Sequence, residues 1–294
     1  MSLKTKLIIC ALAASALSTT VFANAAQPSE NNVLHWAGCG ITKKAFMAEL
    51  AAAYEKKTGV HVDLAGGGAT KGIRETADLK VDMGGTCRMT LPESDSRELH
   101  VTLHPVAWDA LTVIAHKSNP VHNLSSDQIR GIYLGQITNW KQVGGPDQPI
   151  HLYVRQGHIS GVGYAIRQYL FQDSTVDFVT SYVVPSSGPL EKAVESDPLA
   201  MGITGVSSAR KRDVSLVAID GREPTVENVK NGSYGLYRPL YLVSSASPNQ
   251  AVKDFISFAQ SEDGRKVLRA NGTVPYMDAP KLMTKMLIYG FGMK

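Results

Sequence analysis

Between residues 33 and 42 the chain reads VLHWAGCGIT, and this stretch decides the fold. Its first five residues have the apolar character of a strand, and the glycines after them end it. A helix is predicted next, because Phe46, Leu50 and Tyr54 recur at helical offsets and share one face. The local order is therefore strand, glycine-rich turn, helix.

The same unit recurs along the chain. A second strand, His61 to Ala65, leads into Gly66-Gly67-Gly68-Ala69-Thr70, which opens a shorter helix. A brief third strand, 81–84, ends in Gly85-Thr86-Cys87-Arg88, and a strand at 150–155 precedes a helix at 161–172. Alternating strands and helices predict an α/β fold with a mostly parallel sheet.

The length of 294 residues predicts two lobes. Two long extended segments, near 107–117 and 234–244, are predicted to cross between them. We therefore expect lobe 1 to comprise 26–112 plus 240–280, lobe 2 to comprise 113–239, and 281–294 to form a C-terminal tail. In that tail, 283–293 shows no clear helical periodicity.

The composition is that of an ordinary globular protein, with 44% hydrophobic and 19% charged residues, and it excludes disorder. The net charge is +4, and two of the positive charges, Lys4 and Lys6, lie in the first 25 residues. The remaining bias is too weak to predict binding to nucleic acid or to a membrane surface.

The N-terminus has the features of a secretory signal peptide. Lys4 and Lys6 precede an uncharged, mostly apolar run at 7–22, and Ala23-Asn24-Ala25 has the small residues that a signal peptidase accepts. The run is shorter than the roughly 20 residues of a membrane span. Residues 1–25 are therefore predicted to be removed, which places a mature protein starting near Ala26 in the periplasm.

Three turns share one design: Gly38–Thr42, Gly66–Thr70 and Ser160–Gly163 each join a predicted strand to a predicted helix. The first N–H groups of a helix lack intrahelical acceptors and carry the positive end of the helix dipole. Several such turns aimed at one point make an anion site. Each turn taken alone is equally compatible with a plain tight connection.

Five motifs, in order, resemble those of the phosphate-binding proteins of bacterial ABC transporters. They are Gly38–Thr42, Gly66–Thr70, Asp82–Thr86, Ile132–Trp140 and Arg155 with Ser160-Gly161. The segment Ile-Tyr-Leu-Gly-x-Ile-Thr-Asn-Trp at 132–140 is the most specific. The resemblance implies a type II periplasmic binding protein fold, with two α/β lobes that close by a hinge around an oxyanion.

The resemblance also implies a set of ligand-binding residues. By position they are Thr42, Lys43, Ala69, Thr70, Cys87, Arg88, Arg155, Ser160, Gly161 and Val162. An arginine binds two anion oxygens in a planar fork, whereas Val162 offers only its backbone. The alternative for Arg155 is a surface residue or an interlobe salt bridge.

One position departs from the family pattern. Cys87, followed by Arg88, stands where the family places an aspartate that accepts a proton from hydrogen phosphate. Loss of this acceptor weakens the argument for phosphate in particular, while the argument for an anion is unaffected. Arg88 is expected either to add positive charge for the anion or to be a solvated surface charge.

The two cysteines of the mature chain, Cys39 and Cys87, are predicted to lie near the same cleft. In an oxidising compartment they are expected to form a disulfide. Alternatively, they are a pair of thiols that binds a soft species such as arsenite or a copper ion. No Cys-x-x-Cys or His-x-x-x-His spacing supports a preformed metal site, and no cofactor is predicted.

Together these features predict an exported, monomeric solute-binding protein that captures phosphate or a related tetrahedral oxyanion for a membrane ABC permease. A ligand-sensing partner of a membrane receptor is the alternative. No enzyme is predicted, because Ser160 and His158 lie only two residues apart on a turn and the Gly-x-Ser-x-Gly elbow is absent.

Overall fold

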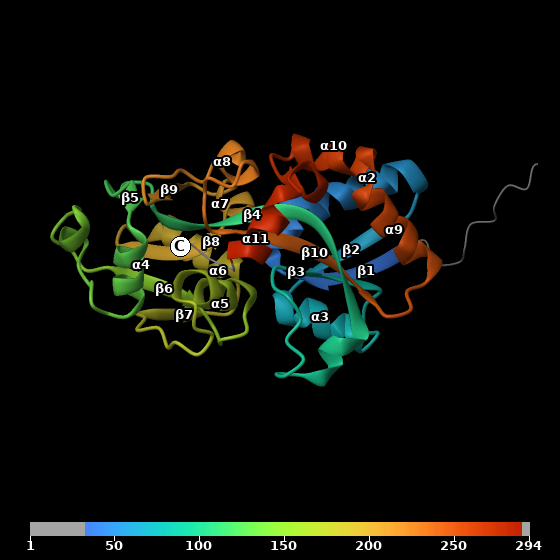
Figure 1. The fold of residues 1–294 in the computed structure, drawn as a ribbon, viewed down its shortest axis with the longest axis horizontal. Coiled ribbons are helices and arrows are strands. Elements are labelled where there is room, and N and C mark those ends of the chain that lie inside the picture. Colours follow the sequence, from blue (N-terminus) through green and yellow to red (C-terminus); the bar gives the residue numbers. More distant parts are fainter. Residues whose placement is uncertain (1–32, 290–294) are drawn as a thin grey trace, which may run out of the picture. The chain divides into compact units, whose positions relative to one another are not determined.

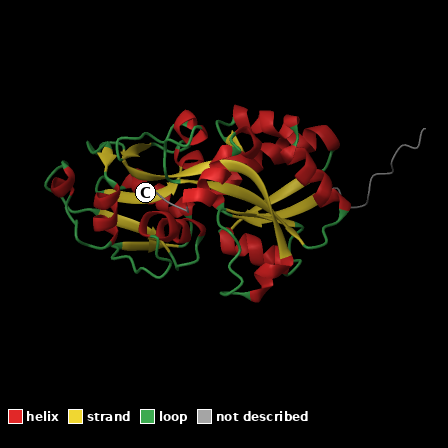
Figure 2. Ribbon diagram, viewed as in Figure 1, coloured by secondary structure: helices red, strands yellow, loops and turns green. Residues whose placement is uncertain are grey.

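The computed structural model describes residues 33–289, whose strands form one connected sheet of 11 strands (Figure 1). Helices cover the sheet, as Figure 2 shows, and the predicted α/β class is confirmed. The predicted signal peptide, residues 1–25, lies outside the described residues. No helix within 33–289 combines the length and the apolar character needed to cross a membrane.

The first group of strands brings the glycine-rich turns to one edge. Strand β1 (Val33–Gly38) runs parallel to β2 (His61–Gly66) on one side and to β3 (Met83–Thr86) on the other. In this register Gly38 lies opposite both Gly66 and Gly85. The carboxyl ends of the three strands therefore meet, which is where ligands bind in open α/β sheets.

A continuous helical segment follows β1. It consists of α1 (Gly40–Thr42), a π-helical turn (Lys43–Met47) and α2 (Ala48–Thr58). The predicted apolar face is buried, and the segment ends at Gly59, whose φ of 77° lies in the left-handed region that glycine favours.

Helix α3 (Ala69–Ala77) packs closely on β3 because glycines face each other there. A methyl group at Gly84 would overlap the carbonyl oxygen of Gly72.

One long strand joins the two groups of strands. Strand β4 (Val101–His116) pairs with β10 (Tyr237–Ser245) and β11 (Val274–Pro275) over its first part. From Leu111 onward it pairs with β8 (Ala200–Gly205) and β9 (Val214–Ile219). The predicted crossing near 107–117 is thus made by the single strand β4. The second predicted crossing, near 234–244, falls on β10, whose described pairings are with β3 and the first part of β4.

The second group of strands is built around β6 (His151–Arg155), which runs parallel to both β8 and β7 (Tyr182–Val184). Strand β5 (Asn123–Leu124) pairs with β9. The helices of this part are α4 (Ser126–Tyr133), α5 (Gly161–Ile166) with its π-helical continuation (Arg167–Phe171), α6 (Ser187–Ser196), α7 (Val206–Ala209) and α8 (Val226–Lys230). Ser125 caps α4 in a capping box with Gln128.

Two helices lie near the C-terminus, α9 (Gln250–Gln260) and α10 (Glu262–Ala270). Because 283–293 shows no clear helical periodicity, no helix was expected there. That expectation is wrong for the described residues, which form α11 (Lys281–Tyr289). Among 281–287, whose side chains are described, Leu282 and Met286 are buried, and two apolar positions make too short a stripe to stand out. Short 3-10 turns occupy Ser96–His100, Trp140–Val143 and Tyr276–Asp278.

Candidate functional site

The three predicted turns meet in the structure. Two of them lie at the joined ends of β1 and β2, and the third, at the start of α5, packs against them. A methyl group at Gly161 would overlap the Cys87 sulfur and would lie 3.0 Å from Cβ of Ala69. We call Cys39, Ala69, Thr70, Cys87, Arg155 and Gly161 the turn cluster.

Arg155, at the end of β6, reaches the turn cluster with its guanidinium. Nη1 donates to Ser187 Oγ at 2.9 Å and Nη2 donates to the Pro185 carbonyl at 2.9 Å. The side chain is buried, and its Nε has no hydrogen-bond partner. Burial lowers the pKa of Arg155, and its electrostatic interactions with the acidic groups of Cys39 and Cys87 oppose this shift. Arg155 is thus neither a surface residue nor a partner in an ion pair with a carboxylate.

The start of α5 supplies backbone donors. Ser160 caps the helix, because its Oγ accepts from the N–H of Gly163 at 3.2 Å. The N–H groups of Gly161 and Val162 belong to the first turn, where no intrahelical acceptor exists. Val162 is fully buried, so any contribution to binding comes from its backbone.

Thr42 and Lys43, the first two predicted ligand-binding residues, form hydrogen bonds to backbone carbonyls at the ends of β1 and β2. The hydroxyl of Thr42, which is buried, donates to the Cys39 carbonyl at 2.7 Å. Lys43 Nζ donates to the Leu64 carbonyl, at the end of β2, at 2.8 Å. The Lys43 ammonium is therefore held by β2 rather than by residues of the turn cluster.

Arg88 has a different role from the two that were expected. Its guanidinium is buried and forms two hydrogen bonds to the buried Glu98 carboxylate, at 2.8 and 2.9 Å. Nε donates to the Ile159 carbonyl at 2.9 Å, and Nη2 donates to Thr70 Oγ1 at 3.3 Å. Its charge is compensated by Glu98, and it links the turn after β3 to the turn before α5.

The two cysteines lie side by side in the turn cluster. Both are buried free thiols, with their sulfur atoms 2.7 Å apart. Burial raises the pKa of Cys39, but a hydrogen bond from Cys87, the charge of Arg238 and the N–H groups of Thr42 and Ile41 outweigh it. The pKa of Cys39 therefore falls to about 6, whereas that of Cys87 rises. Cys39 is therefore the more acidic of the two thiols.

The sequence analysis missed Arg238, on β10. It is 1% exposed, and its Nη1 donates to the carbonyls of Cys87 at 3.0 Å and Gly161 at 2.9 Å. Its Nε and Nη2 are buried without a hydrogen-bond partner. A signal for it existed, because a lone charge interrupts the apolar run at 237–243.

This arrangement is suited to an anion. Three guanidinium nitrogens, Nε of Arg155 and both Nε and Nη2 of Arg238, are buried without a hydrogen-bond partner among residues 33–289. A buried N–H without an acceptor costs about 1–3 kcal/mol, and more when the group is charged. A tetrahedral oxyanion supplies several acceptors at once. Within 33–289 no group of three or more His, Cys, Asp or Glu side chains could hold a metal ion.

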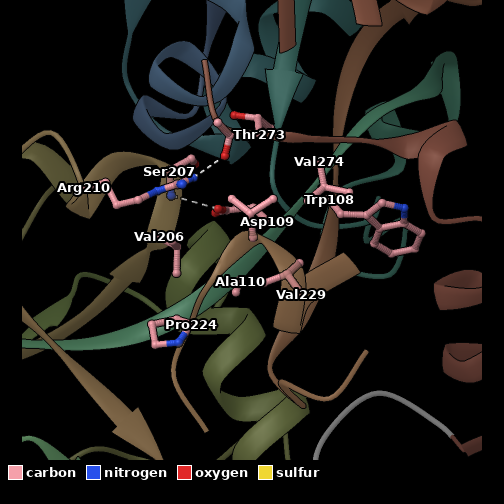
Figure 3. A pocket seen from close by; sticks show the side chains of 12 residues that line it. Trp108, Asp109, Ala110, Val206, Ser207, Arg210, Pro224, Val229, Thr273 and Val274 are labelled. Atoms are coloured by element: carbon pink, nitrogen blue, oxygen red, sulfur yellow. Dashed lines mark hydrogen bonds between the residues drawn. The ribbon is translucent and has the colours of Figure 1, made fainter. Parts of the chain in front are cut away.

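A separate pocket lies beside the middle of β4 (Figure 3). Ser207 N donates to Asp109 Oδ1 at 3.0 Å, while Asp109 Oδ2 and Ser207 Oγ are buried without partners. The cavity measures about 10 Å³, which is room for about one water molecule. It is therefore too small for a solute.

Comparisons with known proteins agree with this geometry. The PBP superfamily domain matches residues 25–263. The phosphate-binding protein PstS of Bacillus subtilis is 24% identical over 225 residues, which cover 76% of this chain and 74% of that protein.

Two solved structures are each 28% identical and cover 83% of this chain and 99% of their own. One is a Clostridium perfringens substrate-binding protein assigned to phosphate ABC transport and solved with bound phosphate (TM-score 0.74). The other is an ABC-type phosphate transport receptor from Vibrio cholerae (TM-score 0.63). They confirm the predicted type II periplasmic binding protein fold.

Proposed function

This chain belongs to the PBP superfamily, and we propose that it captures phosphate or a related tetrahedral oxyanion for an ABC transporter. The named relatives are phosphate-binding and phosphate-transport proteins, and one was solved with phosphate bound. We propose further that this chain is exported, acts as a monomer and performs no catalytic step.

The observation that carries the proposal is the buried Nε–H group of Arg155, at the end of β6, which has no hydrogen-bond partner among the described residues. In the proposed complex the anion accepts hydrogen bonds from Arg155 and from the N–H groups of Gly161 and Val162. The turn at Ala69 and Thr70 faces the same point, because Ala69 packs against Gly161. The anion thereby bridges turns from the two groups of strands.

Binding of this kind favours a closed arrangement. Thr70 and Arg88 already reach across to the Ile159 carbonyl, at 3.3 and 2.9 Å. An anion held by the same turns stabilises these contacts, since a ligand favours the state to which it binds more tightly. We propose that the membrane permease recognises this closed state.

The test is a calorimetric titration with phosphate of the protein starting at Ala26, refolded to remove any anion carried through purification. We expect a dissociation constant in the micromolar range or tighter, corresponding to about −8 kcal/mol or better. A titration with sodium chloride is the control. The absence of heat with phosphate from natively refolded protein would contradict the proposal.

A further inference from the structure

We propose that Arg238 is a second anion-binding arginine of the turn cluster, and that reduced Cys39 serves as its internal counter-ion when no ligand is bound. Oxidation of Cys39 and Cys87 to a disulfide removes this counter-ion and increases the affinity for the external oxyanion. The inference rests on the proposed function, which it deepens by adding a ligand residue and a control by thiol oxidation.

The first step is the position of Arg238. Its Nη1 is fixed by two carbonyls, that of Cys87 after β3 and that of Gly161 at the start of α5. Its guanidinium thus lies where the two groups of strands meet. Nε and Nη2 remain buried without hydrogen-bond partners. A guanidinium has five N–H donors, so most of its donor capacity is open to an anion.

The second step is charge balance. The ionisable groups that interact with Arg238 include Cys39, Cys87, Asp109, Tyr169 and the like-charged Arg155, and Arg155 interacts with the same two cysteines. Asp109 is buried, its carboxylate accepts from Ser207 N, and burial raises its pKa. A negative charge on Cys39 is therefore the compensation placed within the turn cluster itself. Burial lowers the pKa of Arg238, but its electrostatic interactions with the acidic groups of Cys87, Asp109 and Cys39 outweigh this effect and raise the pKa.

The third step is competition between two anions. A thiolate in the turn cluster repels an incoming oxyanion and neutralises the arginines that would bind it. In the disulfide this charge is gone, and an external anion becomes the compensating group. Affinity should thus be higher in the oxidised protein.

The two sulfur atoms are already 2.7 Å apart, but both are buried, so the oxidant reaches one of them only when the closed arrangement opens transiently. The Cys39 thiolate and the Cys87 thiol together lose two electrons and one proton, and one S–S bond forms. The electrons pass to a disulfide oxidant, which takes up that proton and one from water and is reduced to two thiols. Such an oxidant belongs to the oxidising compartment that the predicted signal peptide implies.

The experiment titrates inorganic phosphate into the protein starting at Ala26, once after oxidised dithiothreitol and once after reduced dithiothreitol, at pH 8 and at pH 5.5. A free-thiol assay confirms each state. At pH 8 we expect the oxidised protein to bind at least ~10-fold more tightly, which corresponds to 1.4 kcal/mol. At pH 5.5 the ratio should shrink, because the Cys39 thiol is then largely protonated. Using the ratio at each pH cancels the ionisation of phosphate itself.

Two variants test the proposed roles of Cys39 and Arg238 separately. Cys39→Ala removes the internal anion, so it should bind phosphate like oxidised wild type whether or not reductant is present. Arg238→Gln should weaken binding by the oxidised protein at least ~10-fold.

Each other outcome counts against the inference. Equal affinities of oxidised and reduced wild type at pH 8 overturn it and leave the proposed function standing. Undiminished affinity of Arg238→Gln overturns the assignment of Arg238. Phosphate binding in neither redox state overturns the proposed function together with the inference. If Arg238→Gln does not fold, the comparison of wild type with Cys39→Ala decides.

Discussion

Replacing Arg155 by alanine is expected to raise the dissociation constant for phosphate at least ~100-fold. Truncating one partner of a buried, hydrogen-bonded charge pair costs about 2–5 kcal/mol, and the anion would lose the guanidinium whose Nε is open to it. Arg155→Lys restores the charge but not the planar fork, so it should recover only part of the affinity. Calorimetric titration measures both.

The structural role of Arg155 must be separated from its proposed role in anion binding. Arg155 also holds Ser187 and the Pro185 carbonyl, so its removal is expected to lower the melting temperature as well. Arg222→Ala, which removes the same charge from an exposed position, should leave the affinity within about twofold, because surface charges contribute little. Wild-type affinity in a folded Arg155→Ala protein would exclude Arg155 from the site.

Replacing Glu98 by alanine should lower the free energy of unfolding by about 3–5 kcal/mol, because an unpaired charge is then left buried. Both side chains of the Arg88–Glu98 pair are inaccessible, and Glu98 also accepts from the N–H of Leu91 at 2.8 Å. Urea unfolding monitored by circular dichroism measures the change. A loss below about 1 kcal/mol would contradict the account of this pair.

The Arg88–Glu98 pair makes the free energy of unfolding depend on pH in one direction. Burial raises the pKa of Glu98, but the hydrogen bonds from Arg88 and Leu91 outweigh it and hold the pKa below the ordinary 4.5. The contribution of ionised Glu98 to the free energy of unfolding is therefore fully present above the ordinary pKa. It is lost as the pH falls through the pKa of Glu98 in the folded protein. The stabilities of wild type and Glu98→Ala should accordingly converge in acid. The matched control is Arg97→Ala, which removes the ion pairs of an exposed arginine with Asp95 and Asp78 and should cost less than about 1 kcal/mol.

The strands, turns and helix starts could be predicted because their signals are local. Gly59 ends α2, Ser125 caps α4, and the glycines at 66–68 open α3. Each of these residues acts through its own backbone or through a residue three positions away. The convergence of the turns then follows from the parallel register of β1, β2 and β3.

The charge arrangement of the site could not be predicted in the same way. Arg88 is compensated by Glu98, ten positions away, and Arg238 reaches Gly161 across 77 positions. Such partners are set by tertiary packing, so a sequence shows only that a charge interrupts an apolar run. The short α11 was missed for a related reason, since its two buried residues carry too weak a pattern.

The most direct test of the central claim is a crystal structure grown with arsenate, which matches phosphate in shape and charge, with anomalous data collected at the arsenic edge. The account predicts an anomalous peak within hydrogen-bond distance of the Arg155 guanidinium and of the Gly161 N–H, between the turns at Ala69 and Ser160. A well-ordered arsenate bound elsewhere, with these groups still unpartnered, would contradict it.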